Sequence, residues 1–170
     1  MAPFFEPTKE PPQMTETEMK TVGLGLTWEE YSVGDRYKSL ARTVTETDIV
    51  NFIGVTGMVE VLFTDLTFGK GVQAAGRVAP AALTYSLIEG ILCQTLIQGT
   101  GLAMLELEKK ILAPVVAGDT VHCEVEVVSV RQTSKGNRGI VKTRNEIKNQ
   151  RGETVISYAA TRMVAGRDDA

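Results

Sequence analysis

The sequence predicts a single domain of the α+β class, and three observations support this fold class. A mainly apolar segment with a helical pattern, residues 81–98, occupies the middle of the chain. Four segments in which apolar and polar residues alternate follow it. The chain has 170 residues, 43% of them hydrophobic, which suits one domain with one core. We therefore expect the helix to pack on one face of an antiparallel sheet.

The N-terminal segment has a composition that does not favour folding. Four of the six prolines fall within the first twelve residues, mixed with Glu, Thr and Lys. Such a segment buries too little apolar surface to offset its ordering entropy. We expect residues 1–25 to form a flexible arm, disordered alone or lying over a partner subunit, residues 26–166 to form the domain, and residues 167–170 to be a tail.

A strand and a short helix are expected between this arm and the central helix. Residues 39–44 resemble a strand, and Thr45 and Asp48 then have the spacing of a capping box, with Asp in place of the preferred Glu or Gln. A helix with one apolar face should follow and end near Gly54 or Gly57.

The central helix and the strands after it are defined by clear boundaries. Residues 64–79 are rich in glycine and predict a loop, and Pro80 suits the first residue of a helix. The leucines and isoleucines after it cover most of the helix circumference, which is typical of a helix buried on several sides. Strands are expected at residues 104–112, 120–131, 138–148 and 154–164.

Composition excludes several classes of function. With one histidine, His122, and two cysteines, Cys93 and Cys123, the chain is poorly equipped for a structural zinc site or a histidine-based triad. A net charge of -3 argues against a nucleic-acid binder. Because there is no CxxC pair, no signal-peptide pattern and no apolar run of membrane-spanning length, we expect a cytoplasmic protein.

Two stretches resemble a known family. Residues 52–92, FIGVTGMVEVLFTDLTFGKGVQAAGRVAPAALTYSLIEGIL, and residues 111–131, ILAPVVAGDTVHCEVEVVSVR, are similar to the MaoC-like acyl-CoA hydratases. That family has the hot dog fold and a motif of the form S/T-G-D-x-N-P-apolar-H-x-D. The likeness extends over roughly residues 27–165. It implies a long central helix wrapped by a curved antiparallel sheet.

The resemblance also implies a chemistry and an assembly. Members of the family hydrate a trans-enoyl-CoA, or catalyse the reverse reaction, with an Asp and a His that activate water and a backbone N–H that polarises the thioester carbonyl. It implies no metal and no cofactor other than the coenzyme A of the substrate. Homodimers or higher even oligomers, with acyl pockets between subunits, are expected. An exposed edge strand gives such pairing an independent motive.

The catalytic positions of the family carry different residues here. By the resemblance, Met58 stands at the family's aspartate and Phe63 at its histidine. Neither side chain can bind or deprotonate water, and both suit the wall of an acyl pocket, or the core. The family's asparagine falls on Glu60. The oxyanion N–H falls on Ala81, which still supplies a backbone donor.

Two carboxylates are candidates for replacement acid–base groups. Glu89, where some members have a serine, shares the small and polar stripe of the helix with Ser86, a candidate substrate contact. In an apolar tunnel its pKa would rise, which suits acid–base work; the alternative is a pair with a basic residue across a subunit interface, or contact with water. Glu60 could replace the missing acid, or be an exposed loop carboxylate.

Three functions therefore remain open at this stage. The first is an (R)-specific enoyl-CoA hydratase or 3-hydroxyacyl-CoA dehydratase with atypical catalytic residues, Glu60 or Glu89. The second is a thioesterase that uses Glu89. The third is a non-catalytic protein that binds an acyl thioester or a hydrophobic small molecule beside Met58 and Phe63.

Overall fold

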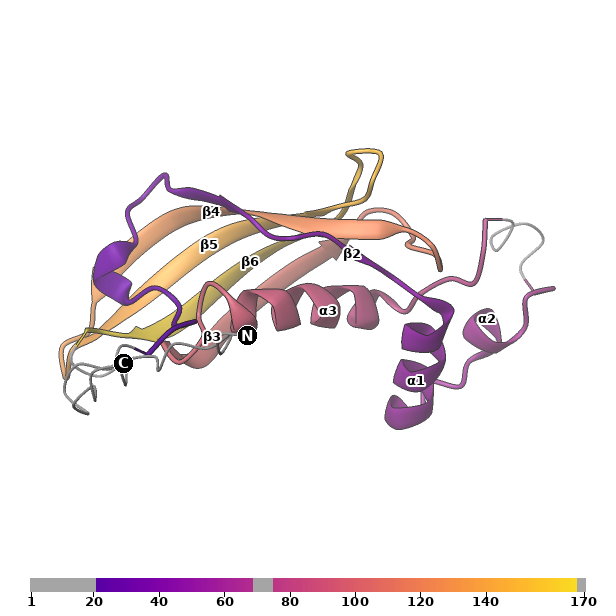
Figure 1. The fold of residues 1–170 in the computed structure, drawn as a ribbon, viewed down its shortest axis with the longest axis horizontal. Helices are drawn as coiled ribbons and strands as arrows, with labels where there is room; N and C mark the ends of the chain where they lie inside the picture. Colours follow the sequence, from indigo (N-terminus) through magenta and orange to yellow (C-terminus); the bar gives the residue numbers. More distant parts are fainter. Residues whose placement is uncertain (1–20, 69–74, 168–170) are drawn as a thin grey trace, which may run out of the picture.

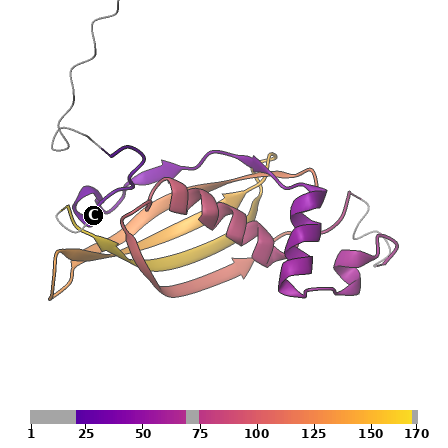
Figure 2. The same cartoon turned by 60° about the horizontal axis from the view of Figure 1, so that its bottom comes forward.

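Six strands form an antiparallel sheet that curves around one long helix, α3 (Ala81–Gln94), as Figures 1 and 2 show. The computed structural model describes residues 21–68 and 75–167. The strand order is β1-β4-β5-β6-β3, and β2 also pairs with β4. The strands are β1 (Arg36–Lys38), β2 (Arg42–Thr43), β3 (Gly101–Ile111), β4 (Thr120–Gln132), β5 (Arg138–Lys148) and β6 (Thr154–Ala165).

The four predicted long strands are confirmed, three of them to within one residue at each end, while β3 begins three residues earlier than predicted. Alternation fixes which side chains face α3, because successive residues of a strand point to opposite faces. In β4, Val121, Cys123 and Val125 are buried in one core with residues of α3, while Val127 is buried in a second cluster with Tyr31. On the outer face of the same strand, Glu124 and Glu126 pair with Lys148 and Arg144 of β5.

The predicted strand at residues 39–44 is wrong in its extent. The chain forms two short strands, β1 and β2, with a break at residues 39–41. At the break the side chain of Ser39 takes part in the bonding: its hydroxyl oxygen accepts the N–H of Cys123 at 2.8 Å, while its own N–H bonds to the Cys123 carbonyl at 2.9 Å. Because a side chain replaces a backbone acceptor here, the regular ladder is interrupted.

The central helix is shorter than predicted, and it ends at Gln94. Pro80 is its N-cap rather than its first residue. After Gln94 the N–H groups of Thr95 and Ile97 both bond to the Leu92 carbonyl, so the chain leaves the helix in a series of turns. The sequence pattern continued to Gln98 because Leu96 and Ile97 pack against the core from these turns.

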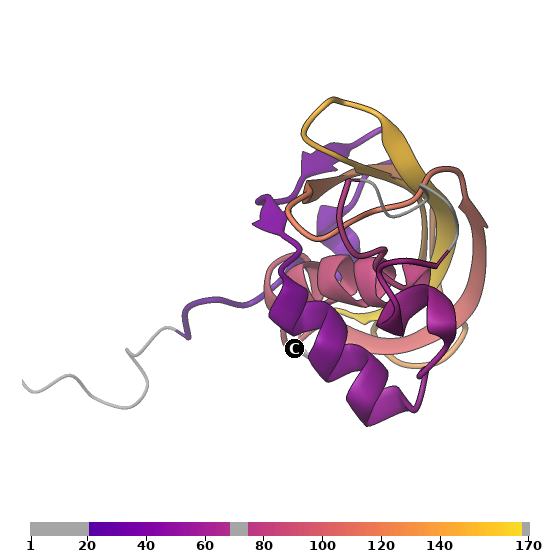
Figure 3. The same cartoon turned by 90° about the vertical axis from the view of Figure 1, so that its right-hand side faces the viewer.

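Two further helices lie beyond the N-terminal end of α3 (Figures 1 and 3). The predicted helix α1 (Glu46–Thr56) is confirmed, with Thr45 and Asp48 forming the capping box and Gly57 ending it at φ 71°. The short helix α2 (Val61–Thr64) was not predicted, because four residues show no helical period. It lies beyond the same end of α3 as α1 does.

Both predicted ends of the domain lie close to residues that the structure does not describe. Most of the predicted arm, residues 1–20, the end of the tail, residues 168–170, and residues 69–74 of the predicted loop lie outside the described residues. From Gly25 onward the chain is bonded to the domain: the N–H groups of Gly25 and Leu26 donate to the carbonyls of Gln98 and Leu96. In the described parts of the chain, no helix has the length and apolar character needed to cross a membrane.

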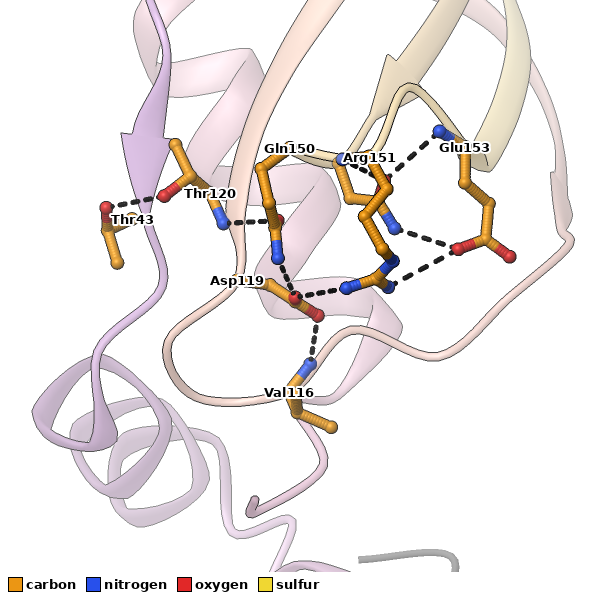
Figure 4. Close-up of polar contacts among 8 residues, drawn as sticks. Thr43, Val116, Asp119, Thr120, Gln150, Arg151 and Glu153 are labelled. Atoms are coloured by element: carbon orange, nitrogen blue, oxygen red, sulfur yellow. Dashed lines mark hydrogen bonds and ion pairs between the residues drawn. The ribbon is translucent and has the colours of Figure 1, made fainter. Parts of the chain in front are cut away.

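A polar network around Asp119 joins the turn before β4 to the turn between β5 and β6 (Figure 4). Asp119 is buried, and its carboxylate accepts hydrogen bonds from the Val116 N–H at 3.0 Å and the Gln150 side-chain amide at 2.6 Å. Gln150 in turn accepts the Thr120 N–H at 2.9 Å. This network holds the segment before β4 in place, and Val115 within that segment helps line the pocket described next.

Candidate functional site

An apolar pocket lies at the N-terminus of α3. Its wall combines Leu62 and Phe63 of α2, Ala81 and Thr84 of the first turn of α3, and Ile156 of β6. The remaining lining residues come from the segments just before α3 and from the end of β3 onward. Of the eleven residues that line it, Thr84 alone has a polar side chain. We call this cavity the helix-terminal pocket.

Ala81 is the first residue of α3, so its N–H has no acceptor within the helix. The helix dipole adds partial positive charge at the same place. An oxygen atom that enters the pocket beside Ala81 would therefore meet a backbone donor. The structure thus places the predicted N–H of Ala81 in the same apolar pocket as Phe63.

Arg77 fixes the position of α2 relative to α1. Its guanidinium donates to the backbone carbonyl of Phe63 at 2.5 Å and to the carboxylate of Glu46, at the start of α1, at 2.5 Å. Phe63 itself is half-buried and packs against the core. One arginine therefore holds Phe63 at the wall of the pocket.

Met58 lies in the link between α1 and α2, and Glu60 lies at the end of that link. Met58 is 37% exposed and does not line the helix-terminal pocket. Glu60 is exposed, and its carboxylate caps α2 by accepting the N–H of Leu62 at 2.7 Å. It is thus a helix cap rather than a plain loop residue, one turn before the pocket-lining Phe63.

Glu89 forms an ion pair inside its own chain. Its two carboxylate oxygens lie 2.6 Å and 2.8 Å from Nη2 of Arg162, and the hydroxyl of Tyr158 donates to one of them at 2.8 Å. The expected alternative was a basic partner across a subunit interface, whereas the partner is Arg162 of β6 in the same chain. With both oxygens engaged, the carboxylate is poorly placed to act as a nucleophile.

The surroundings of Glu89 keep the neighbouring groups in fixed protonation states. Burial, with the charges of Cys123 and Glu89, raises the pKa of the Tyr158 hydroxyl. Burial likewise raises the pKa of the Cys123 thiol to about 12. Burial would lower the pKa of Arg162, but the adjacent Glu89 carboxylate outweighs it and raises that pKa. Near neutral pH, Tyr158 and Cys123 are thus neutral and Arg162 is charged.

The polar stripe of α3 does not converge on the helix-terminal pocket. Ser86 is exposed and lines a separate groove between α3 and residues 40–42. Glu89 and Cys93 line another groove, with the start of β3 and Arg162. The structure therefore brings together Phe63 and Ala81, while Ser86, Glu89 and Met58 each lie elsewhere.

The single histidine is also remote from the pocket. His122 lies on the outer side of β4, with Nε2 3.7 Å from a carboxylate oxygen of Glu124. Its side chain is 15% exposed. Among the described residues, no carboxylate and no imidazole lines the helix-terminal pocket.

Sequence reasoning missed Arg162, Tyr158 and Thr84. A signal for the first two was present in the predicted strand, where residues 156, 158, 160, 162 and 164 alternate in phase and an arginine stands within an otherwise mainly apolar buried series. A buried charge of this kind needs a partner. Thr84 gave no signal, since a threonine in a helix ordinarily bonds to its own backbone.

A curved antiparallel sheet wrapped around one helix, with an apolar pocket at the helix N-terminus, is the arrangement expected of a hot dog fold. A family model described as MaoC like domain matches residues 30–150. The chain therefore belongs to the MaoC-like domain family, as the resemblance predicted.

Individual relatives agree with this assignment. A 63-residue segment is 41% identical to mesaconyl-CoA hydratase from Cereibacter sphaeroides, and the match spans 37% of this chain but only 18% of that protein. A MaoC-like dehydratase from Rhodospirillum rubrum is 25% identical, with a TM-score of 0.71 over 84% of this chain and 99% of that chain. A double hot dog protein from Mycobacterium tuberculosis, 18% identical with a TM-score of 0.71, covers 89% of this chain and 47% of that chain and supports the fold.

Proposed function

We propose that this protein binds an acyl thioester, with the acyl group in the helix-terminal pocket and the carbonyl oxygen beside the N–H of Ala81. One observation carries the proposal: an otherwise apolar pocket is lined by Ala81, the first residue of α3, whose N–H has no acceptor within the helix. Apolar walls suit an acyl chain, and a single well-placed donor suits its carbonyl. The likeness to mesaconyl-CoA hydratase, a protein named for a CoA thioester, supports coenzyme A as the carrier.

Hydration by the usual pair of side chains is not part of this proposal. Adding water to a double bond requires a base for the water and an acid for the α-carbon. Apolar residues and Thr84 line the described wall of the pocket. We therefore favour binding of the thioester over its hydration by this chain, with Met58 and Phe63 as the residues that replace the family's catalytic pair.

A hydratase that uses Glu60 is the second candidate, and one observation favours it. Glu60 caps α2, the helix that supplies Leu62 and Phe63 to the pocket wall. Catalysis by Glu60 requires a shift of α2 that brings this carboxylate to the pocket. In this version Glu60 carries the proton transfer and Ala81 holds the oxyanion.

We further propose that the protein assembles through β3. All eleven residues of this edge strand are exposed, among them Leu102, Leu105 and Leu107. An exposed edge strand favours pairing with a second copy, and the leucines of β3 lie mainly before its charged residues Glu106, Glu108, Lys109 and Lys110. Ile111, at the end of β3, is 50% exposed and lines the helix-terminal pocket, so a partner on this edge would lie beside the acyl group.

The experiment follows two signals from one mixture. Purified protein is incubated with crotonyl-CoA while the loss of the enoyl absorbance and the release of free thiol are recorded. Binding is measured by titration calorimetry with butyryl-CoA, the saturated analogue. We expect binding of butyryl-CoA with no change in either signal.

Three other outcomes would redirect the assignment. The Glu60 hydratase would be established if the wild type consumes the enoyl absorbance, Glu60→Gln does not, and the outer-face control Glu146→Gln still does. Thiol release that Glu89→Gln abolishes would establish a thioesterase. If butyryl-CoA does not bind and neither signal changes, the proposed function is wrong.

A further inference from the structure

Thr84 is the one polar side chain of the helix-terminal pocket, and its hydroxyl lacks a partner. The residue is 1% exposed. Its Oγ1 atom has no hydrogen-bond partner within the described part of the chain. A buried hydroxyl without a partner is costly, since it has lost water and gained nothing in return.

Three other threonines, two in helices and one at the C-cap of α3, show what Thr84 does not do. The hydroxyls of Thr56, Thr64 and Thr95 each donate to the carbonyl four residues earlier, at 2.6 Å, 3.1 Å and 2.7 Å. The corresponding carbonyl for Thr84 is that of Pro80; it accepts the ordinary helical bond from the Thr84 N–H at 3.2 Å, and the Thr84 hydroxyl does not bond to it. The Thr84 hydroxyl therefore does not make the hydrogen bond to the helix backbone that these three threonines make.

The side chain of Thr84 and the backbone donor of Ala81 belong to the same turn of α3. Side chains of a helix lean toward its N-terminus, so the side chain of Thr84 lies over the turn that begins with Ala81. Residues three apart share a face of the helix. Ala81 and Thr84 both line the pocket, and an oxygen atom bound beside the Ala81 N–H would thus be within the same small volume as the Thr84 hydroxyl.

We propose that Thr84 is a binding residue for the carbonyl group of the ligand, with its hydroxyl as the second donor beside the N–H of Ala81. This inference rests on the proposed binding of an acyl thioester, and it adds a side chain that selects ligands with an oxygen at the carbonyl position. Two donors directed at one oxygen discriminate a thioester from the corresponding thioether, which has the same chain but no carbonyl.

The ligand reaches this hydroxyl by displacing part of the wall. Oγ1 is closed off from water, so contact requires a shift of a neighbouring element. The four-residue helix α2 is the smallest element of the wall, and its Leu62 and Phe63 are only half-buried. Movement of these two side chains would uncover the first turn of α3.

The test compares butyryl-CoA with S-butyl-CoA, its thioether, on three proteins by titration calorimetry. Thr84→Val removes the hydroxyl and keeps the shape, whereas Thr84→Ser keeps the hydroxyl. We expect the wild type and Thr84→Ser to prefer the thioester. Thr84→Val should bind the thioester about three- to tenfold more weakly, as for one lost hydrogen bond, and bind the thioether unchanged.

Thermal unfolding of the free proteins gives a second, independent readout. Thr84→Val should leave Tm unchanged or raise it, because it removes a buried hydroxyl that has no partner. The control Thr95→Val, at a back-bonded threonine outside the pocket, should leave both affinities unchanged. A lowered Tm for Thr84→Val with an unchanged thioester preference would overturn the inference and show a hydroxyl bonded internally.

Failure of this inference is distinct from failure of the proposed function. If the wild type prefers the thioester and Thr84→Val keeps the same preference, the thioester-binding function stands but the role of Thr84 is refuted. If it binds neither ligand, the proposed function is wrong and the role of Thr84 falls with it.

Discussion

Oε1 of Glu89 lies 2.6 Å from Nη2 of Arg162 and accepts a hydrogen bond from Tyr158 at 2.8 Å. This ion pair joins the middle of α3 to the inner face of β6, between two mostly buried side chains. Arg162 also donates to Thr143 of β5 at 3.3 Å, which extends the network across the sheet. The helix is thus tied to the sheet by charge as well as by apolar packing.

Removing one partner of this pair should destabilise the fold strongly. We expect Arg162→Met to lower the free energy of unfolding by about 3–5 kcal/mol, because it leaves the Glu89 carboxylate buried without its counter-charge. Urea denaturation monitored by circular dichroism measures the change. Replacing both partners, Glu89→Leu with Arg162→Met, should recover most of the loss. A loss below about 1 kcal/mol in the single variant would show that the pair does not hold the helix.

The fold was largely predictable from the sequence because most of it follows from local patterns. Alternation over residues 120–131 and 138–148 fixed both strands, and the Thr45–Asp48 spacing fixed the start of α1. The errors in the predicted boundaries fall where tertiary contacts determine where a strand or helix ends. The Ser39 hydroxyl interrupts the predicted strand by bonding to Cys123. The turns after Gln94 end α3 while their apolar residues continue its pattern.

The candidate site was less predictable, since its contacts join distant parts of the chain. The family likeness predicted Ala81 and Phe63, and these two residues do line one pocket. No sequence pattern revealed that Glu89 meets Arg162, 73 residues later, or that the Thr84 hydroxyl is left without a partner. Spacing along a helix predicts on which face of the helix a side chain lies. Which side chain of the sheet it contacts there depends on the register of the strands.

The capping box of α1 should make stability depend on pH at the acid end. The hydrogen bond from the Thr45 hydroxyl lowers the pKa of Asp48, as do the Thr45 N–H and Arg42, although burial opposes them. A lowered pKa in the folded state means that the stabilisation is complete above the unfolded value, about 3.9, and is lost as the pH falls through the folded value.

Asp48→Asn is the variant that measures this effect. We expect it to unfold about 0.5–1 kcal/mol more easily than the wild type at pH 7, because it removes a negative charge from the first turn of α1. Urea titrations from pH 7 to pH 2.5 should show the difference narrowing below about pH 4. A difference that stays constant down to pH 2.5 would contradict the assignment of the lowered pKa to Asp48.

The Asp119 network should contribute more to stability than the exposed ion pair beside it. Burial would raise the pKa of Asp119, but hydrogen bonds from Gln150 and Val116 outweigh it and lower that pKa. Asp119→Ala should lower the free energy of unfolding by about 2–3 kcal/mol, since buried donors lose a charged acceptor. Glu153→Ala, at the exposed partner of Arg151, should cost less than about 1 kcal/mol. Equal losses in chemical denaturation would refute this ranking.

The assembly through β3 gives the last prediction. Leu105 and Leu107 are exposed on the edge strand, 50% and 38% respectively. Lysines on an edge strand oppose pairing with another strand. We expect the wild type to be a dimer or larger even oligomer in size-exclusion chromatography with light scattering. The double variant Leu105→Lys with Leu107→Lys should be a monomer. It should also bind butyryl-CoA more weakly, because Ile111 places the pocket beside the same edge. Val33→Lys, before β1 at the opposite edge, is the matched control and should leave the oligomer intact. A monomeric wild type that binds butyryl-CoA would separate ligand binding from pairing and refute the shared site.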